Sequence, residues 1–278
     1  MRPENFQIKK ENGQLEDFSI EKFRKSLLKS HATLEQIQQV ENQLQAEWYP
    51  GIRTRDIYKM ASRLLRRQSP AKSARFGLKK AIMTLGPSGY PFEKFIGALF
   101  AAQGYEVQVG QVLNGKCVTH EMDVVATKGD ELVLVECKYH NQSGINVDVK
   151  VPLYINSRFQ DLLENGVVRS PQTRFTGWIA TNSRFSDDAE SFGRCKGIQL
   201  LSWNYPNGNS LRDWIDRLRL YPVTCLQTLN GSEKKYLLDA GIVMVKELVA
   251  NPAWLEKAGL QKNRLEHARA EVLELITD

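Results

Sequence analysis

The sequence predicts a multidomain α/β protein with a mostly helical N-terminal part, a mixed α/β middle part and an all-α C-terminal part. The chain has 278 residues, more than the about 100–200 residues of a typical domain. The hydrophobic pattern changes near residues 86 and 205, from helical spacing to alternating helix and strand patterns and back again. We therefore expect separate domains over residues 1–86, 87–205 and 206–278.

The N-terminal part opens with a strand–turn–strand pattern and continues with helical patterns. The runs Phe6–Ile8 and Leu15–Phe18 flank the pair Asn12-Gly13, which is a strong signal for a β-hairpin. Ser19 is predicted to cap the helix that follows, and Thr54 to cap a second helix with apolar residues at helical spacing. The hairpin and the two helix starts are thus predicted from short sequence motifs.

The middle part alternates helix and strand patterns after a linker-like Gly-Pro-Ser-Gly segment at residues 86–89. An apolar stripe predicts a helix over residues 92–100 that ends by Gly104. Further helices are predicted over 151–164 and 187–196, and strands over 107–112, 122–126, 132–139, 178–181 and 199–201. This alternation predicts a central mixed sheet with helices packed on it.

The C-terminal part reads as helical throughout. Helices are predicted over residues 211–218, 232–238, 243–249 and 255–275. The segment Ala240-Gly241-Ile242 is predicted to form a tight turn between two of them.

The composition excludes several classes of protein. No apolar run approaches the about 18 residues of a membrane span, and the first ten residues have no apolar core of a secretory signal. The four cysteines are scattered, which argues against structural zinc and a disulfide framework and favours a cytoplasmic location. The net charge of +6 permits a polyanionic partner, and it fits an ordinary basic protein equally well.

Three charged residues stand in the apolar, β-rich runs of the middle part. Asp123 lies within Met122–Ala126, and Glu136 and Lys138 end the next apolar run. Strand side chains alternate between faces, so Glu136 and Lys138 should share one face while Cys137 points to the other. An unpaired buried ion costs several kcal/mol, roughly, and such charges are tolerated mainly where they hold a metal or do chemistry.

Two carboxylates and an ammonium at one sheet edge have the chemistry to bind Mg²⁺ and activate a water. The alternative is a buried ion pair without catalysis, formed by Lys138 with either Glu136 or Asp123.

The middle part resembles the PD-(D/E)xK nuclease superfamily, close to its Mrr-like restriction endonuclease branch. The resemblance covers about 115 residues and rests on Gly89–Glu93, Gly104–Val107, Glu121–Val125, Val135–Lys138, Ile179–Asn182 and Gly197–Leu201. It implies that Asp123, Glu136 and the Cys137 carbonyl hold Mg²⁺ or Mn²⁺. It also implies that Lys138 orients water or stabilises developing charge, and that Glu93 approaches as a further catalytic carboxylate.

Two histidines and one helix face beside this motif are further candidates. His120 and His140 flank the motif strands, where they would contact phosphate, carry a proton or simply be hydrogen-bonded beside the cleft. Lys150, Tyr154 and Arg158 recur at helical spacing, so they line either a DNA groove or a solvated helix face.

The N-terminal part resembles the ATP-cone domain, a nucleotide-sensing module. The matching segments are Ile8–Gly13, Glu16–Phe18, Lys22-Phe23, Gly51–Ile57 and Ser73–Phe76. The resemblance implies a regulatory ATP or dATP near Lys10, Gly13, Thr54 and Tyr58, although Glu11 stands where an arginine is usual. The alternative is a cone that serves as a DNA-binding or dimerising domain. No G-x-x-x-x-G-K-[ST] loop is present, so we expect no hydrolysis there.

The C-terminal part resembles a helix-hairpin-helix module around Leu237–Ile242, which implies phosphate contacts; plain helical packing is the alternative.

Together these features predict a metal-dependent DNA endonuclease regulated by nucleotide binding. A non-catalytic, nucleotide-sensing regulator that binds nucleic acid is the competing hypothesis, followed by an adaptor. The expected partners are duplex DNA, an adenine nucleotide and a second copy of the chain, with no membrane.

Overall fold

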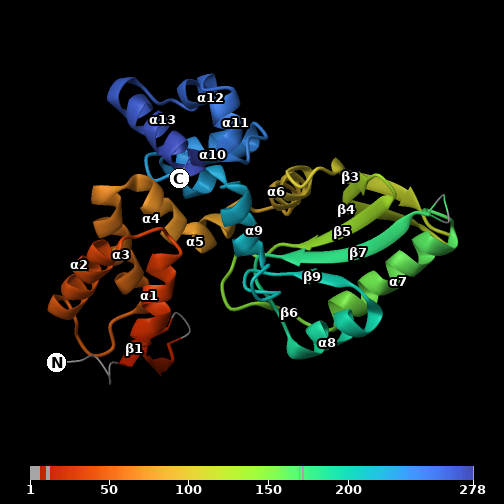
Figure 1. Cartoon of the computed structure of the whole chain (residues 1–278), viewed down its shortest axis with the longest axis horizontal. Helices are drawn as coiled ribbons and strands as arrows, with labels where there is room; N and C mark the ends of the chain where they lie inside the picture. Colours follow the sequence, from red (N-terminus) through yellow and green to blue (C-terminus); the bar gives the residue numbers. More distant parts are fainter. Residues whose placement is uncertain (1–6, 11–12, 169, 171, 278) are drawn as a thin grey trace.

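A computed structural model describes residues 7–10, 13–168, 170 and 172–277 (Figure 1). The N-terminal helices lie on one side, the sheet with its helices lies on the other, and the C-terminal helices pack above the N-terminal ones. None of the helices in the described part of the chain is long and apolar enough to cross a membrane.

The N-terminal part is a short hairpin followed by five helices. Strands β1 (Gln7–Lys9) and β2 (Leu15–Asp17) pair in antiparallel fashion, which confirms the predicted hairpin, and Gly13 turns the chain with a φ of +86°. Phe6 and Asn12 lie outside the described residues. The helices are α1 (Ile20–Leu28), α2 (Leu34–Ala46), α3 (Thr54–Gln68), α4 (Pro70–Phe76) and α5 (Leu78–Ile82).

The two predicted helix caps have different outcomes. The Ser19 hydroxyl accepts a hydrogen bond from the Lys22 amide at 3.2 Å, so its prediction is confirmed. The prediction for Thr54 is wrong, because Thr54 is the first helical residue and Arg53 precedes it without a side-chain cap. Lys9 lies beside Arg53 in a parallel bridge, so the Thr54 hydroxyl donates to the Lys9 carbonyl at 3.5 Å instead.

The middle part is a five-stranded mixed sheet, as predicted. Its strands lie in the order β3-β4-β5-β7-β9, with the first three antiparallel and the last three parallel. They are β3 (Glu106–Asn114), β4 (Thr119–Lys128), β5 (Glu131–Lys138), β7 (Arg174–Thr181) and β9 (Gln199–Leu201). A small parallel pair, β6 (Asn146–Val147) and β8 (Arg184–Phe185), was not predicted.

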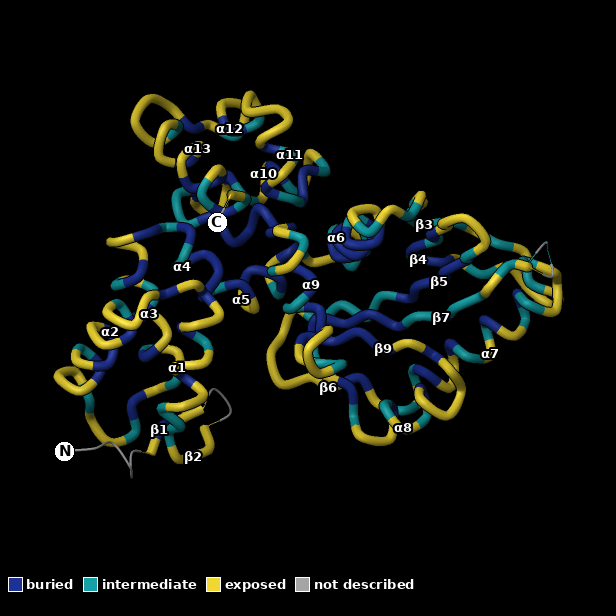
Figure 2. The backbone as a smooth tube through the Cα atoms, viewed as in Figure 1, coloured by how far each residue is buried: buried dark blue, intermediate teal, exposed yellow. Residues whose placement is uncertain are grey.

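Helices cover both faces of this sheet, and β5 is buried over most of its length (Figure 2). Val133 and Val135 belong to the buried cluster that includes α6 (Tyr90–Ala101), whereas Leu132 and Leu134 belong to the cluster that includes α7 (Lys150–Glu164) and α8 (Asp187–Lys196). Each such side chain contributes about 1.5–3 kcal/mol on full burial, which fixes the register of β5 and the face of every residue after it.

The C-terminal part is helical, with one predicted helix broken in two. Its elements are α9 (Leu211–Leu218), the 3₁₀ turn η1 (Val223–Cys225), α10 (Gly231–Asp239), α11 (Val245–Ala250), α12 (Ala253–Lys257) and α13 (Lys262–Thr277). The prediction of a single helix over 255–275 is wrong, because Gly259 has a φ of +98° and ends α12 in a left-handed conformation. The predicted tight turn at Gly241 lies between α10 and α11.

One buried apolar cluster runs across residue 86. It joins Ala74, Leu78 and Ile82 of α4 and α5 to Leu226 and Leu275 of the C-terminal part, and it continues into α6 and the sheet. The last helices before the linker-like segment therefore share a core with the C-terminal helices.

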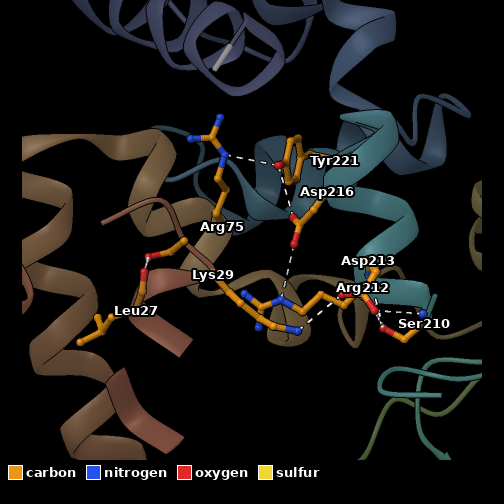
Figure 3. Close-up of polar contacts among 9 residues, drawn as sticks. Leu27, Lys29, Arg75, Ser210, Arg212, Asp213, Asp216 and Tyr221 are labelled. Carbon is orange, nitrogen blue, oxygen red and sulfur yellow. Dashed lines mark hydrogen bonds and ion pairs between the residues drawn. The ribbon is translucent and has the colours of Figure 1, made fainter. Parts of the chain in front are cut away.

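A polar network reinforces this junction (Figure 3). Arg75 is 1% exposed and donates to the Tyr221 hydroxyl at 3.3 Å and to the carbonyls of Glu274 and Leu275 at 3.2 and 3.3 Å. The Tyr221 hydroxyl donates in turn to Asp216 Oδ1 at 3.4 Å. These contacts join α4 to α9 and to the carboxyl end of α13.

Candidate active site

The predicted charged residues meet where β4 and β5 separate. The β4–β5 ladder runs as far as the pair Val124–Val135. Just beyond it, the Asp123 carboxylate, rather than a backbone carbonyl, accepts the Cys137 amide hydrogen bond at 2.6 Å. Lys138 Nζ donates to Glu136 Oε1 at 2.6 Å, so these two side chains share a face, as the strand alternation predicts.

Arg158 of α7 completes the arrangement, and the alternative that it lies on a solvated helix face is wrong. The alternative that it lines a DNA groove stays a prediction. The Arg158 side chain is only 11% exposed, and Nη1 donates to Glu136 Oε2 at 2.6 Å while Nη2 donates to the Glu121 carbonyl. The sequence carries one signal for this position, because Arg158 stands between Ile155 and Phe159, which form the buried stripe of the helix. Glu136, itself 4% exposed, is thus held between two cations.

Burial and mutual repulsion perturb two of the carboxyl groups. Burial, together with the charges of Asp123, Glu121 and Glu136, raises the pKa of Glu93 to about 7. Burial and the charge of Glu136 raise the pKa of Asp123 to about 6. Glu93 lies in the first turn of α6, so the helix edge and the two strands contribute to one acidic environment. A divalent cation relieves repulsion of this kind.

The donor atoms fit a hard metal ion. Burial raises the pKa of the Cys137 thiol well above its ordinary value, so this sulfur stays protonated and is a poor ligand. The amide and carbonyl of one strand residue face the same side, so the Cys137 carbonyl faces Asp123. Asp123, Glu136 and this carbonyl form an all-oxygen set of the kind that Mg²⁺ binds.

Glu93 does not complete a cluster of three acidic ligands. Within residues 7–277, apart from the undescribed 11, 12, 169 and 171, no three His, Cys, Asp or Glu side chains are grouped closely enough to hold a metal. The residues that could contact a metal ion here are therefore limited to two carboxylates and one carbonyl.

Both flanking histidines are held in place by neighbouring side chains, His120 through its ring and His140 through its main chain. His120 Nε2 lies 2.7 Å from Asp161 Oδ2, and Asp161 also accepts the Cys117 amide hydrogen bond at 2.8 Å, which ties the β3–β4 turn to α7. Burial opposes ionisation of Asp161, but hydrogen bonds from His120, Cys117 and Val118 outweigh it and lower its pKa to about 2. The main chain of His140 is held by Asn182, whose side chain both accepts from its amide, at 2.9 Å, and donates to its carbonyl, at 2.7 Å.

The predicted nucleotide residues lie along the hairpin and the start of α3. Lys10 forms an ion pair with Glu16 across the hairpin, and Thr54 contacts the Lys9 carbonyl. Tyr58 stands one turn after Thr54, is 40% exposed and stacks on Phe76 with ring centroids 5.1 Å apart. Glu11 lies outside the described residues.

Two family models match the chain, one described as a restriction endonuclease over residues 86–215 and one as AF1548-like, C-terminal, over residues 221–276. An uncharacterized protein of Archaeoglobus fulgidus is 30% identical over 179 residues, which are 64% of this chain and 98% of the relative. The chain belongs to the AF1548-like family. The predicted Mrr-like restriction endonuclease segment is thereby confirmed, and residues 1–85 lie outside both matches.

Two solved structures are similar to this chain. A crystal structure of the protein of unknown function AF1548 is 28% identical and has a TM-score of 0.53. The matched region covers 68% of this chain and 96% of the AF1548 chain. The MspJI restriction endonuclease, solved in complex with a 27-mer oligonucleotide, is 15% identical, covers 74% of this chain and 41% of its own, and has a TM-score of 0.34. By its two family matches and its fold, this member of the AF1548-like family combines a restriction-endonuclease-like domain with a helical C-terminal part.

Proposed function

We propose that this protein is a metal-dependent DNA endonuclease that hydrolyses phosphodiester bonds. The observation that carries the proposal is the convergence of Asp123, Glu136 and Lys138 at the end of β5, within the restriction endonuclease domain. These groups supply the two requirements of the reaction, oxygen ligands for a divalent ion and a cation beside them.

Each residue has a distinct role in the proposed reaction. Asp123, Glu136 and the Cys137 carbonyl would hold Mg²⁺ or Mn²⁺, which when bound polarises a phosphoryl oxygen and lowers the pKa of a water. Lys138 would donate to the charge that develops on the phosphate or orient the attacking water. Glu93, with a pKa of about 7, can accept a proton near neutral pH.

Cleavage of plasmid and linear duplex DNA is expected to require Mg²⁺ or Mn²⁺ and to rise as the pH increases from about 5 to about 7. Below its pKa of about 6, Asp123 carries a proton that competes with the metal. Below its pKa of about 7, Glu93 is already protonated and cannot accept a proton. Agarose-gel assays with EDTA, followed by readdition of either ion, measure both dependences. Cleavage that persists in EDTA, or a rate that falls across this pH range, would contradict the proposal.

A non-catalytic regulator that binds nucleic acid is the second candidate, and one observation favours it. Lys138 and Arg158 already neutralise Glu136, which is also what a buried structural ion cluster looks like. A chain that binds duplex DNA but cleaves it with neither metal ion would support this candidate over the first.

We also propose that residues 1–86 bind ATP or dATP and that this binding regulates the nuclease. The support is the resemblance to the ATP-cone, together with Lys10 on the hairpin and the half-exposed Tyr58 one turn beyond Thr54. Calorimetric titration with ATP, dATP and ADP is expected to give binding without hydrolysis, weakened in Lys10→Ala because one phosphate contact is lost. No heat with any of the three nucleotides would leave this part of the chain without a ligand.

A further inference from the structure

A cavity of about 310 Å³ adjoins the candidate active site. It lies between α5, which belongs to the N-terminal part of the chain, and the loops that follow β5 and β7. Its lining is Lys79, Met83, His140, Gln142, Ser143, Gly144, Ile145, Asn146, Asn182, Ser183 and Arg184.

The cavity is strongly cationic. Lys79 and Arg184 both line it, and no carboxylate is found among its described lining residues. Desolvation and the like charge of Arg184 lower the pKa of Lys79, so the two side chains are close enough to repel each other. Neither cation has an ion-pair partner in the described part of the chain. Two neighbouring cations without a counter-charge favour an anionic ligand.

The walls of the cavity are fixed by specific contacts. The Tyr139 hydroxyl donates to the Met83 carbonyl at 2.8 Å, which holds the end of α5 against the end of β5. Asn182, 2% exposed, fixes the peptide groups of His140 from the neighbouring strand. The small β6–β8 pair places Asn146 directly beside Arg184. Part of the cavity wall is therefore held in place by contacts within the protein.

His140 links this cavity to the end of β5. His140 Nδ1 is enclosed, yet it has no hydrogen-bond partner among the described residues. His140 also stands two residues beyond Lys138, a separation of roughly 6–7 Å along an extended chain. An anion in this cavity would therefore lie next to the proposed reaction centre.

We propose that this cavity binds a backbone phosphate of the DNA strand, one that neighbours the phosphate under attack. Lys79 and Arg184 supply the positive charge that holds the phosphate, so the site reads position and not base sequence. The inference rests on the proposed nuclease function. It makes the N-terminal part a contributor to substrate binding, because Lys79 comes from α5.

Equilibrium binding of a short labelled duplex, measured by fluorescence anisotropy with Ca²⁺ in place of Mg²⁺ at several salt concentrations, tests the proposal. Lys79→Ala and Arg184→Ala are each expected to weaken binding about 10-fold and to reduce the salt slope by about 1, the effect of one lost phosphate contact. Arg184→Lys keeps the charge and should keep the slope. The matched control is Lys80→Ala, because Lys80 is the next residue on α5 and lines a different cavity.

The outcomes separate this proposal from the nuclease proposal. If the wild-type chain cleaves DNA and both alanine variants bind like Lys80→Ala, the phosphate site is overturned and the nuclease stands. If the wild type neither cleaves nor binds DNA, calorimetry with inorganic phosphate decides whether the cavity binds an anion at all. Binding that is lost in Lys79→Ala and Arg184→Ala would keep an anion site without a nuclease, and no binding would overturn both.

Discussion

Replacing Lys138 with alanine is expected to slow DNA cleavage at saturating substrate by about 10²- to 10³-fold, the usual effect of removing one donor that stabilises transition-state charge. Lys138 Nζ contacts Glu136 at the end of β5, where Asp123 also converges. The fold should persist, because Arg158 still pairs with Glu136 after the substitution. The measurement is the single-turnover cleavage rate in Mg²⁺, with thermal unfolding recorded for the same preparation.

A second test variant and a control accompany Lys138→Ala. Asp123→Asn removes a proposed metal ligand while keeping the shape of the side chain, so it should lose activity to a similar degree. Lys80→Ala removes a lysine from α5 without touching β5 and should cleave at the wild-type rate. Wild-type cleavage by both Lys138→Ala and Asp123→Asn would remove these residues from the catalytic machinery.

Arg75→Ala is expected to cause the largest loss of stability among the substitutions considered, about 3 kcal/mol. The substitution leaves buried carbonyls of α13 and the Tyr221 hydroxyl without their partner, and each orphaned group costs about 1–3 kcal/mol. It also removes a cation from the carboxyl end of α13, where positive charge is favourable. Thermal unfolding should shift downward by about 6–12 °C, at about 2–4 °C per kcal/mol.

The control for this variant comes from the same junction. Lys29 pairs with Asp213 at 3.5 Å, but its side chain is 51% exposed, so Lys29→Ala should cost about 0–1 kcal/mol (Figure 3). Equal melting temperatures for Arg75→Ala and Lys29→Ala would mean that the buried network contributes no more than a surface ion pair.

The sequence predicts the sheet well, because its signals are local. The strands of the middle part alternate or run apolar for several residues, and Glu136 and Lys138 stand out as charges within such runs. The β6–β8 pair has two residues in each strand, too few for any periodicity to appear. The break at Gly259 was missed because a single glycine is also tolerated inside a helix.

The remaining differences depend on packing between distant segments. The Thr54 hydroxyl donates to the carbonyl of Lys9, a strand residue that lies 45 residues earlier in the chain. Arg158 is drawn inward by Glu136, and its place between Ile155 and Phe159 is the local signal in α7 for this burial. Lys79 lines a cavity with Arg184 because the end of α5 lies beside the end of β5, where the Tyr139 hydroxyl donates to the Met83 carbonyl. The chemical roles of Asp123, Glu136, Cys137 and Lys138 and the three domain boundaries stay predictions.

The buried cluster that crosses residue 86 has a consequence for a chain cut by a protease. Gly86–Gly89 form an irregular segment between α5 and α6, which is where a protease would find accessible backbone. A cut there would separate the chain covalently, but Ala74, Leu78 and Ile82 would remain packed against Leu226 and Leu275. The two pieces should therefore travel together through gel filtration, and two separately expressed halves should reassemble when mixed.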